Sequence, residues 1–145
     1  MASTHDNDLR LEEMATGEQS GTWGTKTNTN LELIADAFGS GTENMGSDAN
    51  TTITMADATA DAVRALFLTI TSTTLTATRE VTLAPNTVNK IWIIKNSTTG
   101  SQTITIKQGS GGTVNIANGQ TKVIITDCAG RAAAATEVSL TASAV

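Results

Sequence analysis

The strongest constraint on this chain is an alternation of apolar and polar residues that begins near residue 50 and continues almost to the C-terminus. Successive side chains of a strand point to opposite faces of a sheet, so this alternation predicts half-buried strands. The alternating runs are residues 52–55, 66–70, 81–83, 103–107, 114–116 and 123–125. A further run, residues 91–94, is apolar throughout and predicts a central strand that is buried on both faces.

Turn-forming residues separate these runs. Pro85-Asn86 suits a β-turn, Asn118-Gly119 suits a two-residue hairpin, and the glycine-rich residues 109–112 suit a longer hairpin loop. The alanines of residues 132–135 fit either a helix or a terminal strand. About seven or eight short strands with such turns predict a mainly β fold, and we expect residues 50–145 to form a single β-sandwich or jelly-roll-like domain.

Composition limits the core that this domain can build. Threonine occurs 28 times, and its branched side chain favours strands over helices. Aromatic residues make up only 3% of the chain, so the core must come from aliphatic side chains. Charged residues make up 16%, against about 25% in an ordinary domain, which leaves many uncharged surface positions. We therefore expect subunits to bury further surface against one another.

Residues 1–49 have a different character and are expected to form an extended N-terminal arm with one short helix. The residues before about position 26 show no period. Residues 29–38, approximately, then carry an apolar stripe at helical spacing, and residues 40–49 have the Gly, Ser and Asn content of a flexible link. The stripe consists of Leu31, Ile34, Ala35 and Phe38.

The ends of this helix also have sequence signals. Thr29 and Glu32 have the spacing of an N-terminal capping box, and Gly39 suits the left-handed residue that often ends a helix. A helix of about ten residues is unstable alone. It must therefore pack on its own domain or dock on another protein, and the sequence leaves both alternatives open.

A tryptophan between two glycines precedes the helix, in Gly21-Thr22-Trp23-Gly24. Tryptophan is the largest apolar side chain and favours a pocket, whereas glycine lets the backbone bend and approach a neighbour closely. We expect this cluster to form an attachment surface with Leu31, Ile34 and Phe38 of the helix, and Trp23 to be its anchor. The alternative is that Trp23 fills the domain's own core beside a turn.

The sequence argues against several classes of function. The nine basic residues are scattered and the net charge is −5, which disfavours nucleic-acid binding. His5 and Cys128 are single residues of their types, so a catalytic pair or a conventional zinc site is not expected, and Cys128 is expected to be a buried thiol. Residues 109–113 lack the lysine of a phosphate-binding loop. We expect no enzyme activity, no cofactor and no metal ion.

Membrane insertion and secretion are not expected either. An apolar run of about 18 residues is missing, and the N-terminal residues are polar rather than those of a signal peptide. The single cysteine fits synthesis in a reducing cytoplasm.

Residues 7–13, 16–25 and 28–34, which include the Gly-Thr-Trp-Gly motif, resemble the N-terminal segment of a family of bacteriophage virion proteins. Members occur in phages of aquatic bacteria and are usually labelled tail-fibre-like. The resemblance continues more loosely through residues 84–87 and 100–111. It implies a non-enzymatic structural component of the virion, made in the cytoplasm of a bacterial host. It also implies contacts with other virion proteins and a homotrimeric state.

Three functions remain open at this stage. The resemblance implies a fibre or appendage subunit on the outside of the virion, anchored through its N-terminal arm. Small size and a weakly charged surface would also suit a capsid decoration (cement) protein that stabilises the head. The third is a carbohydrate-binding module for a host surface glycan, which would need exposed aromatic rings as stacking platforms. The absence of tyrosine and the place of Trp92 in the expected central strand weaken this third function.

Overall fold

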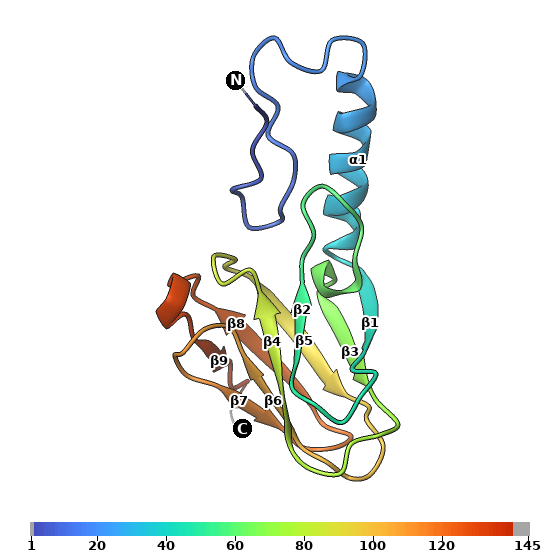
Figure 1. Ribbon diagram of the computed structural model, residues 1–145, viewed down its shortest axis with the longest axis vertical. Helices are drawn as coiled ribbons and strands as arrows, with labels where there is room; N and C mark the ends of the chain where they lie inside the picture. Colours follow the sequence, from blue (N-terminus) through green and yellow to red (C-terminus); the bar gives the residue numbers. More distant parts are fainter. Residues whose placement is uncertain (1, 141–145) are drawn as a thin grey trace, which may run out of the picture.

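A computed structural model describes residues 2–140 as a mainly β protein with two sheets, one α-helix and two short 3-10 turns (Figure 1). The helix α1 spans Trp23–Asp36, and the 3-10 turns η1 and η2 span Ala62–Arg64 and Gly130–Ala132. The strands are β1 Ser40–Asn44, β2 Thr51–Thr54, β3 Phe67–Thr71, β4 Arg79–Ala84, β5 Ile91–Asn96, β6 Ile104–Lys107, β7 Val114–Ile116, β8 Thr121–Thr126 and β9 Ala135–Glu137.

The chain alternates between the two sheets through its first six strands. The five-stranded sheet has the order β1-β3-β5-β8-β9, and the four-stranded sheet has the order β2-β4-β6-β7. The pairs within β1, β3 and β5, and within β2, β4 and β6, are parallel, because each crossover to a parallel neighbour passes through a strand of the other sheet. The pairs that involve β7, β8 or β9 are antiparallel. This winding differs from the antiparallel connectivity of a jelly roll.

The register shows that the first six strands repeat as three stacked rungs: β1 with β2, β3 with β4, and β5 with β6. Leu68 of β3 lies opposite Gly41 of β1 on one side and Ile94 of β5 on the other. Val81 of β4 has the corresponding place between β2 and β6. The strands of equivalent rungs begin at residues 40, 67 and 91, and the unequal spacing explains why the sequence shows no clear repeat.

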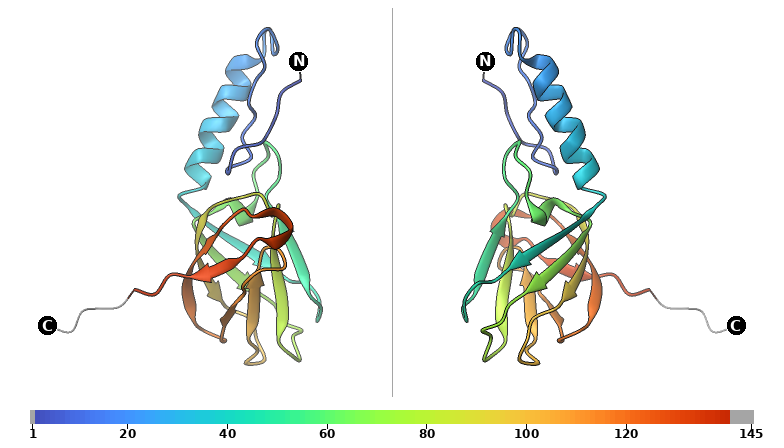
Figure 2. Two further views of the ribbon diagram at one scale, coloured as in Figure 1. Left: turned by 90° about the vertical axis from the view of Figure 1, so that its left-hand side faces the viewer. Right: turned by 90° about the vertical axis from the view of Figure 1, so that its right-hand side faces the viewer.

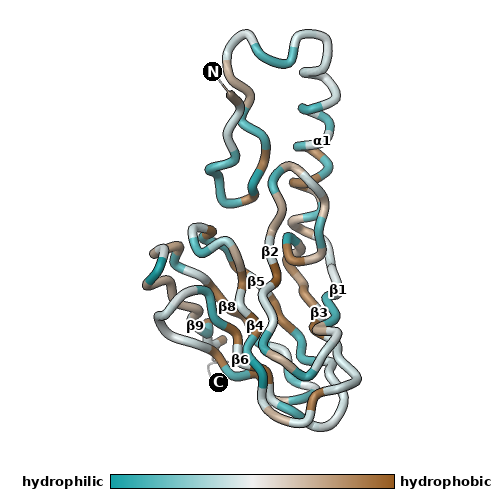
Figure 3. Tube along the Cα trace, in the orientation of Figure 1, coloured by the Kyte–Doolittle hydropathy of each residue, from teal (hydrophilic) through white to brown (hydrophobic). Residues whose placement is uncertain are grey.

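The two sheets bury a common aliphatic core. Hydrophobic residues, brown in Figure 3, occur along the strands of both sheets. Leu68, Ile70 and Ile94 of the five-stranded sheet have no exposed surface. Trp92 is 1% exposed, and its indole nitrogen donates a 2.7 Å hydrogen bond to the carbonyl of Val63 in η1. The expected central strand at residues 91–94 is confirmed as β5, in the middle of its sheet. The expected burial of both faces is wrong, because Ile91 is 49% exposed and Ile93 is half-buried.

The helix and the residues before it project from one end of the sheets, as Figures 1 and 2 show from three sides. No helix within residues 2–140 is long and apolar enough to cross a bilayer.

The expected mainly β architecture and most expected strands are confirmed, but three connections differ from expectation. Residues 40–44, expected as part of a flexible link, form β1 and pair in parallel with β3. The turn at Asn118-Gly119 joins β7 to β8, which lie in different sheets, so it is not the turn of a hairpin. The alanine-rich residues divide between η2 and β9.

The glycine-rich residues 109–112 do form the loop of a hairpin, between β6 and β7. Their second role is close packing. A Cβ added at Gly111 would lie 2.4 Å from the carbonyl oxygen of Ala132, and Gly109 N donates a 2.8 Å hydrogen bond to Ala133 O. The glycines therefore allow this loop to lie directly against the backbone that leads into β9.

Candidate attachment surface

The N-terminal segment, defined here as residues 2–22, folds back on itself and is not an extended arm. Thr4 and Glu13 pair as an isolated antiparallel bridge with hydrogen bonds of 3.1 and 2.8 Å. The Asn7 side chain organises the bend, since its Oδ1 accepts hydrogen bonds from Leu9 N and Leu11 N at 3.2 and 2.9 Å. Asparagine side chains form such turns readily. The expected extended arm is thus replaced by a loop that holds its own shape.

Glu12 joins this segment to α1 at three points. Its backbone N–H and carbonyl bond the side-chain amide of Asn30 at 3.0 and 2.9 Å. Its carboxylate, which is 7% exposed with the rest of the residue, accepts from Lys26 Nζ and Gln19 Nε2, each at 2.9 Å. The hydrogen bond from Lys26 lowers the pKa of Glu12, and this outweighs the opposing effect of burial. The segment and the helix therefore form one unit.

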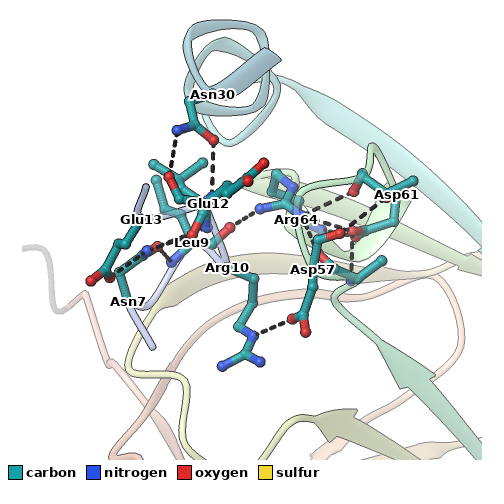
Figure 4. A network of polar contacts seen from close by, with 12 residues as sticks. Asn7, Leu9, Arg10, Glu12, Glu13, Asn30, Asp57, Asp61 and Arg64 are labelled. Atoms are coloured by element: carbon teal, nitrogen blue, oxygen red, sulfur yellow. Dashed lines mark hydrogen bonds and ion pairs between the residues drawn. The ribbon is translucent and has the colours of Figure 1, made fainter. Parts of the chain in front are cut away.

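Arg64 joins the same segment to the sheets (Figure 4). Its guanidinium has no exposed surface and donates to the carbonyl of Leu9, to Ala56 O at 2.7 Å and to Thr59 O at 3.0 Å. It also forms an ion pair with Asp61 at 3.2 Å. A single buried cation thus holds three carbonyl groups, one of them from the N-terminal segment.

A second ion pair lies beside Arg64. Arg10 Nε contacts Asp57 Oδ1 at 2.7 Å, and Ala58 N donates to Arg10 O at 2.8 Å. The hydrogen bond from Arg10 lowers the pKa of Asp57. These contacts fix the position of the N-terminal segment, and through it that of α1, relative to the sheets.

Residues 21–24, called here the tip, lead from the loop at the far end of the projecting unit into the first turn of α1 (Figure 1). Gly21 has φ +79°, in the left-handed region that glycine adopts at low cost. Trp23 N and the Thr22 hydroxyl both donate to Gln19 O, at 2.8 and 3.2 Å. This turn starts α1 at Trp23, six residues earlier than predicted. The Trp23 side chain is 63% exposed, which excludes the alternative that it fills this chain's own core.

The two sides of α1 have different surroundings. Leu33 and Ala37 are 2% and 7% exposed, whereas Leu31 and Phe38 are 59% and 77% exposed and Ile34 is half-buried. The predicted stripe is therefore largely free, and an adjacent strip of the helix packs within the chain. Leu31, Leu33 and Ile34 are all apolar, so two helical faces were consistent with the sequence. The expectation missed Leu33 because Leu31, Ile34 and Phe38 matched helical spacing equally well.

Both predicted helix caps are wrong. Thr29 lies inside α1, where its hydroxyl donates to Thr25 O at 3.1 Å and cannot cap the first turn. The helix ends at Asp36 with Ala37 in a right-handed conformation. Gly39 follows the helix, and its N–H donates to Asp36 O at 2.9 Å.

An apolar hollow of about 260 Å³ lies at the base of α1 and is called here the basal hollow. Its walls come from Leu9, Ala37, Phe38, Leu66, Lys90 and Ile91. Lys90 contributes its hydrocarbon stem, because its amine donates to Ala65 O and Ile91 O at 3.1 Å and lies 4.7 Å from the centre of the Trp92 ring. Burial lowers the pKa of Lys90 to about 8. Ile91 is 49% exposed at the rim.

The described residues contain neither a metal-binding cluster nor a buried thiol. Residues 2–140 hold no group of three or more His, Cys, Asp or Glu side chains placed to bind a metal ion. Cys128 is exposed in the turn after β8, not buried as expected. Neither a protein-family model, nor a curated protein, nor a solved structure matches this chain.

Proposed function

We propose that this chain is a non-enzymatic structural subunit on the outside of a bacteriophage virion. It is a fibre- or appendage-type subunit that contacts other virion proteins through the tip at residues 21–24 and associates with itself as a homotrimer. The observation that carries the proposal is the exposure of Trp23 at the start of α1, the end of this helix that points away from the sheets. The resemblance of the N-terminal residues to tail-fibre-like proteins supplies the class of particle.

The structure of the tip supports this role on physical grounds. Burial of the exposed Trp23 indole against a partner would contribute about 2–3 kcal/mol to binding. The Glu12 and Arg64 contacts hold the unit in one position before binding. A preformed site loses less conformational entropy on association than a flexible arm does.

The two alternative functions are a capsid decoration protein and a carbohydrate-binding module. A capsid decoration protein would use the same tip on a different virion surface, and copy number per particle separates the two. A carbohydrate-binding module needs exposed rings together on one face. Trp23 and Phe38, the strongly exposed rings among residues 2–140, lie at opposite ends of α1, which does not favour a sugar platform.

The proposal is tested by incorporation of variants into particles. Trp23→Ala should reduce incorporation about 30- to 150-fold, the equivalent of losing about 2–3 kcal/mol of burial. Trp23→Phe should retain part of it. Leu140→Ala is the matched control, because Leu140 is 81% exposed and does not belong to the tip.

Incorporation is measured by quantitative mass spectrometry of purified particles, and folding of each variant by circular dichroism. Wild-type incorporation of a folded Trp23→Ala chain would overturn the role of the tip.

A further inference from the structure

We propose that the exposed side of α1 and the basal hollow form the surface through which copies of this chain associate side by side, in parallel. The surface is distinct from the tip and does not depend on which particle the tip contacts. The row of residues along this side is called the seam and consists of Thr27, Leu31 and Ile34 of α1 and of Phe38, two residues after the helix ends.

The spacing of the seam residues is the first reason to expect that a second copy of the chain binds this surface. The seam residues follow one another at intervals of four, three and four, the pattern of the contact line in a left-handed helix bundle. They fall on one side of α1. On the neighbouring side, Asn30 bonds Glu12 of the N-terminal segment, and Leu33 and Ala37 are buried. Leu31 and Phe38 of the seam are exposed, whereas Thr27 and Ile34 are half-buried, so the chain itself covers this side only in part.

Shape is the second argument. A symmetric interface must be complementary to itself. Here a protruding ring, Phe38 at 77% exposure, stands beside the basal hollow, whose walls are apolar. The ring and the hollow lie at the same level along α1, since Phe38 and Ala37 both line the hollow. When the helices of two copies run parallel, the Phe38 ring of one copy lies level with the hollow of the next.

Charge is the third argument. The chain carries a net charge of −5, so copies repel one another unless the contact surface is neutral. The seam contains no ionisable side chain. The acidic residues of α1, Glu32 and Asp36, are on the other side of the helix, and the amine of Lys90 is bound to two carbonyls of its own chain. An acidic or basic partner would find no complementary charge here, whereas a second copy meets an equally neutral surface.

The shape of the molecule permits such a contact. The helix projects beyond the sheets, so neighbouring helices can approach along their length (Figure 2). Fourteen residues of helix offer few layers of contact, and Ile91 and Leu66 at the base extend the apolar surface onto the sheets. A side-by-side contact would therefore bury more apolar surface than two helices alone.

A cysteine crosslinking experiment tests the arrangement in a Cys128→Ser background. Around a symmetry axis between parallel helices, identical seam positions meet. Thr27→Cys should therefore form a disulfide between chains under mild oxidation. Thr25→Cys is the matched control, because Thr25 is exposed on the opposite side of the same helix. Efficient crosslinking at both positions, or at neither, would overturn the proposal.

Sedimentation velocity supplies the second readout, on purified protein without particles. The full chain should be oligomeric at micromolar concentration, and Leu31→Gln with Phe38→Ser should weaken association about 100-fold or more, since two large apolar contacts are lost. Circular dichroism should remain unchanged, because both side chains are exposed in the single chain. Trp23→Ala should stay oligomeric. A wild-type monomer at 100 µM, or an oligomer that the double variant preserves, would contradict the proposal; loss of particle incorporation alone would concern only the tip.

Discussion

Arg64 shows how one residue can determine the position of a whole segment. Its side chain is fully buried, yet it contacts carbonyl groups from three places in the chain and the carboxylate of Asp61. Burying a cation is costly unless hydrogen bonds replace the lost water. The carbonyl of Leu9 supplies one of these bonds, so the N-terminal segment helps to stabilise the cation that holds it.

Replacing Arg64 should release this segment. Arg64→Met keeps most of the side-chain volume but leaves three carbonyls without this donor and Asp61 without its ion pair, and we expect the free energy of unfolding to fall by about 3 kcal/mol. Urea denaturation measures this loss. Hydrogen exchange should also accelerate at the amides of residues 9–13, before the sheets open.

Arg131→Met is the control for this experiment, because Arg131 is exposed in η2. It should change the stability by less than about 0.5 kcal/mol. If Arg64→Met were equally mild, or if residues 9–13 stayed protected in it, Arg64 would not be what fixes the segment.

At the scale of the element, α1 combines an internal face with an external one. Leu33 is 2% exposed and Leu31 is 59% exposed, although they are two residues apart on the same helix. Both residues are leucines of the same helix, so replacing either by alanine changes helix propensity equally. A comparison of the two variants therefore measures the difference in packing.

Truncating each leucine should give very different results. Leu33→Ala should lower the free energy of unfolding by about 2–4 kcal/mol, because Leu33 is buried and its truncation leaves a cavity on the inner side of α1. Leu31→Ala should cost less than about 0.5 kcal/mol at nanomolar concentration, where copies are dissociated. At higher concentration its cost should grow, as linkage to association requires. Thermal denaturation over a range of concentrations measures both; equal costs at high dilution would contradict the assigned faces.

The elements also show which structural features could be read from the sequence. Strands with alternating side chains were predictable, because burial of one face imposes the period directly. The strand β1 was not, since its Ser, Gly, Thr, Glu and Asn residues resemble a link and its place at the sheet edge needs few apolar contacts. The start of α1 was missed because Gly24 and the five threonines and asparagines between residues 25 and 30 have low helix propensity. Contacts of Lys26 and Asn30 with Glu12 stabilise those turns, and such contacts lie beyond local sequence.

For the whole molecule, the alternate use of two sheets makes a compact body from weakly hydrophobic strands. Each of the three rungs contributes one strand to each sheet, and the antiparallel strands β7, β8 and β9 complete the far side. The sequence predicts a sandwich but not this winding, since parallel and antiparallel pairing both follow from the same alternation. The exposed tip was predictable from the unusual position of Trp23 between glycines, whereas the basal hollow unites residues from four distant stretches.

The projecting unit has two proposed surfaces, the tip for a particle and the seam for further copies. We propose that the chain lies on the outside of the virion, with its sheets directed away from the surface to which the tip is bound. The number of copies then depends on the site of attachment.

The most direct test is cryo-electron microscopy of purified particles, combined with copy number from quantitative mass spectrometry. We predict density for this chain at a tail appendage, in groups of parallel copies, with the Trp23 tips against a neighbouring virion protein and about a dozen chains or a small multiple per particle. Hundreds of copies on the head would identify a decoration protein instead. Absence of the chain from intact, infectious particles would contradict the central claim.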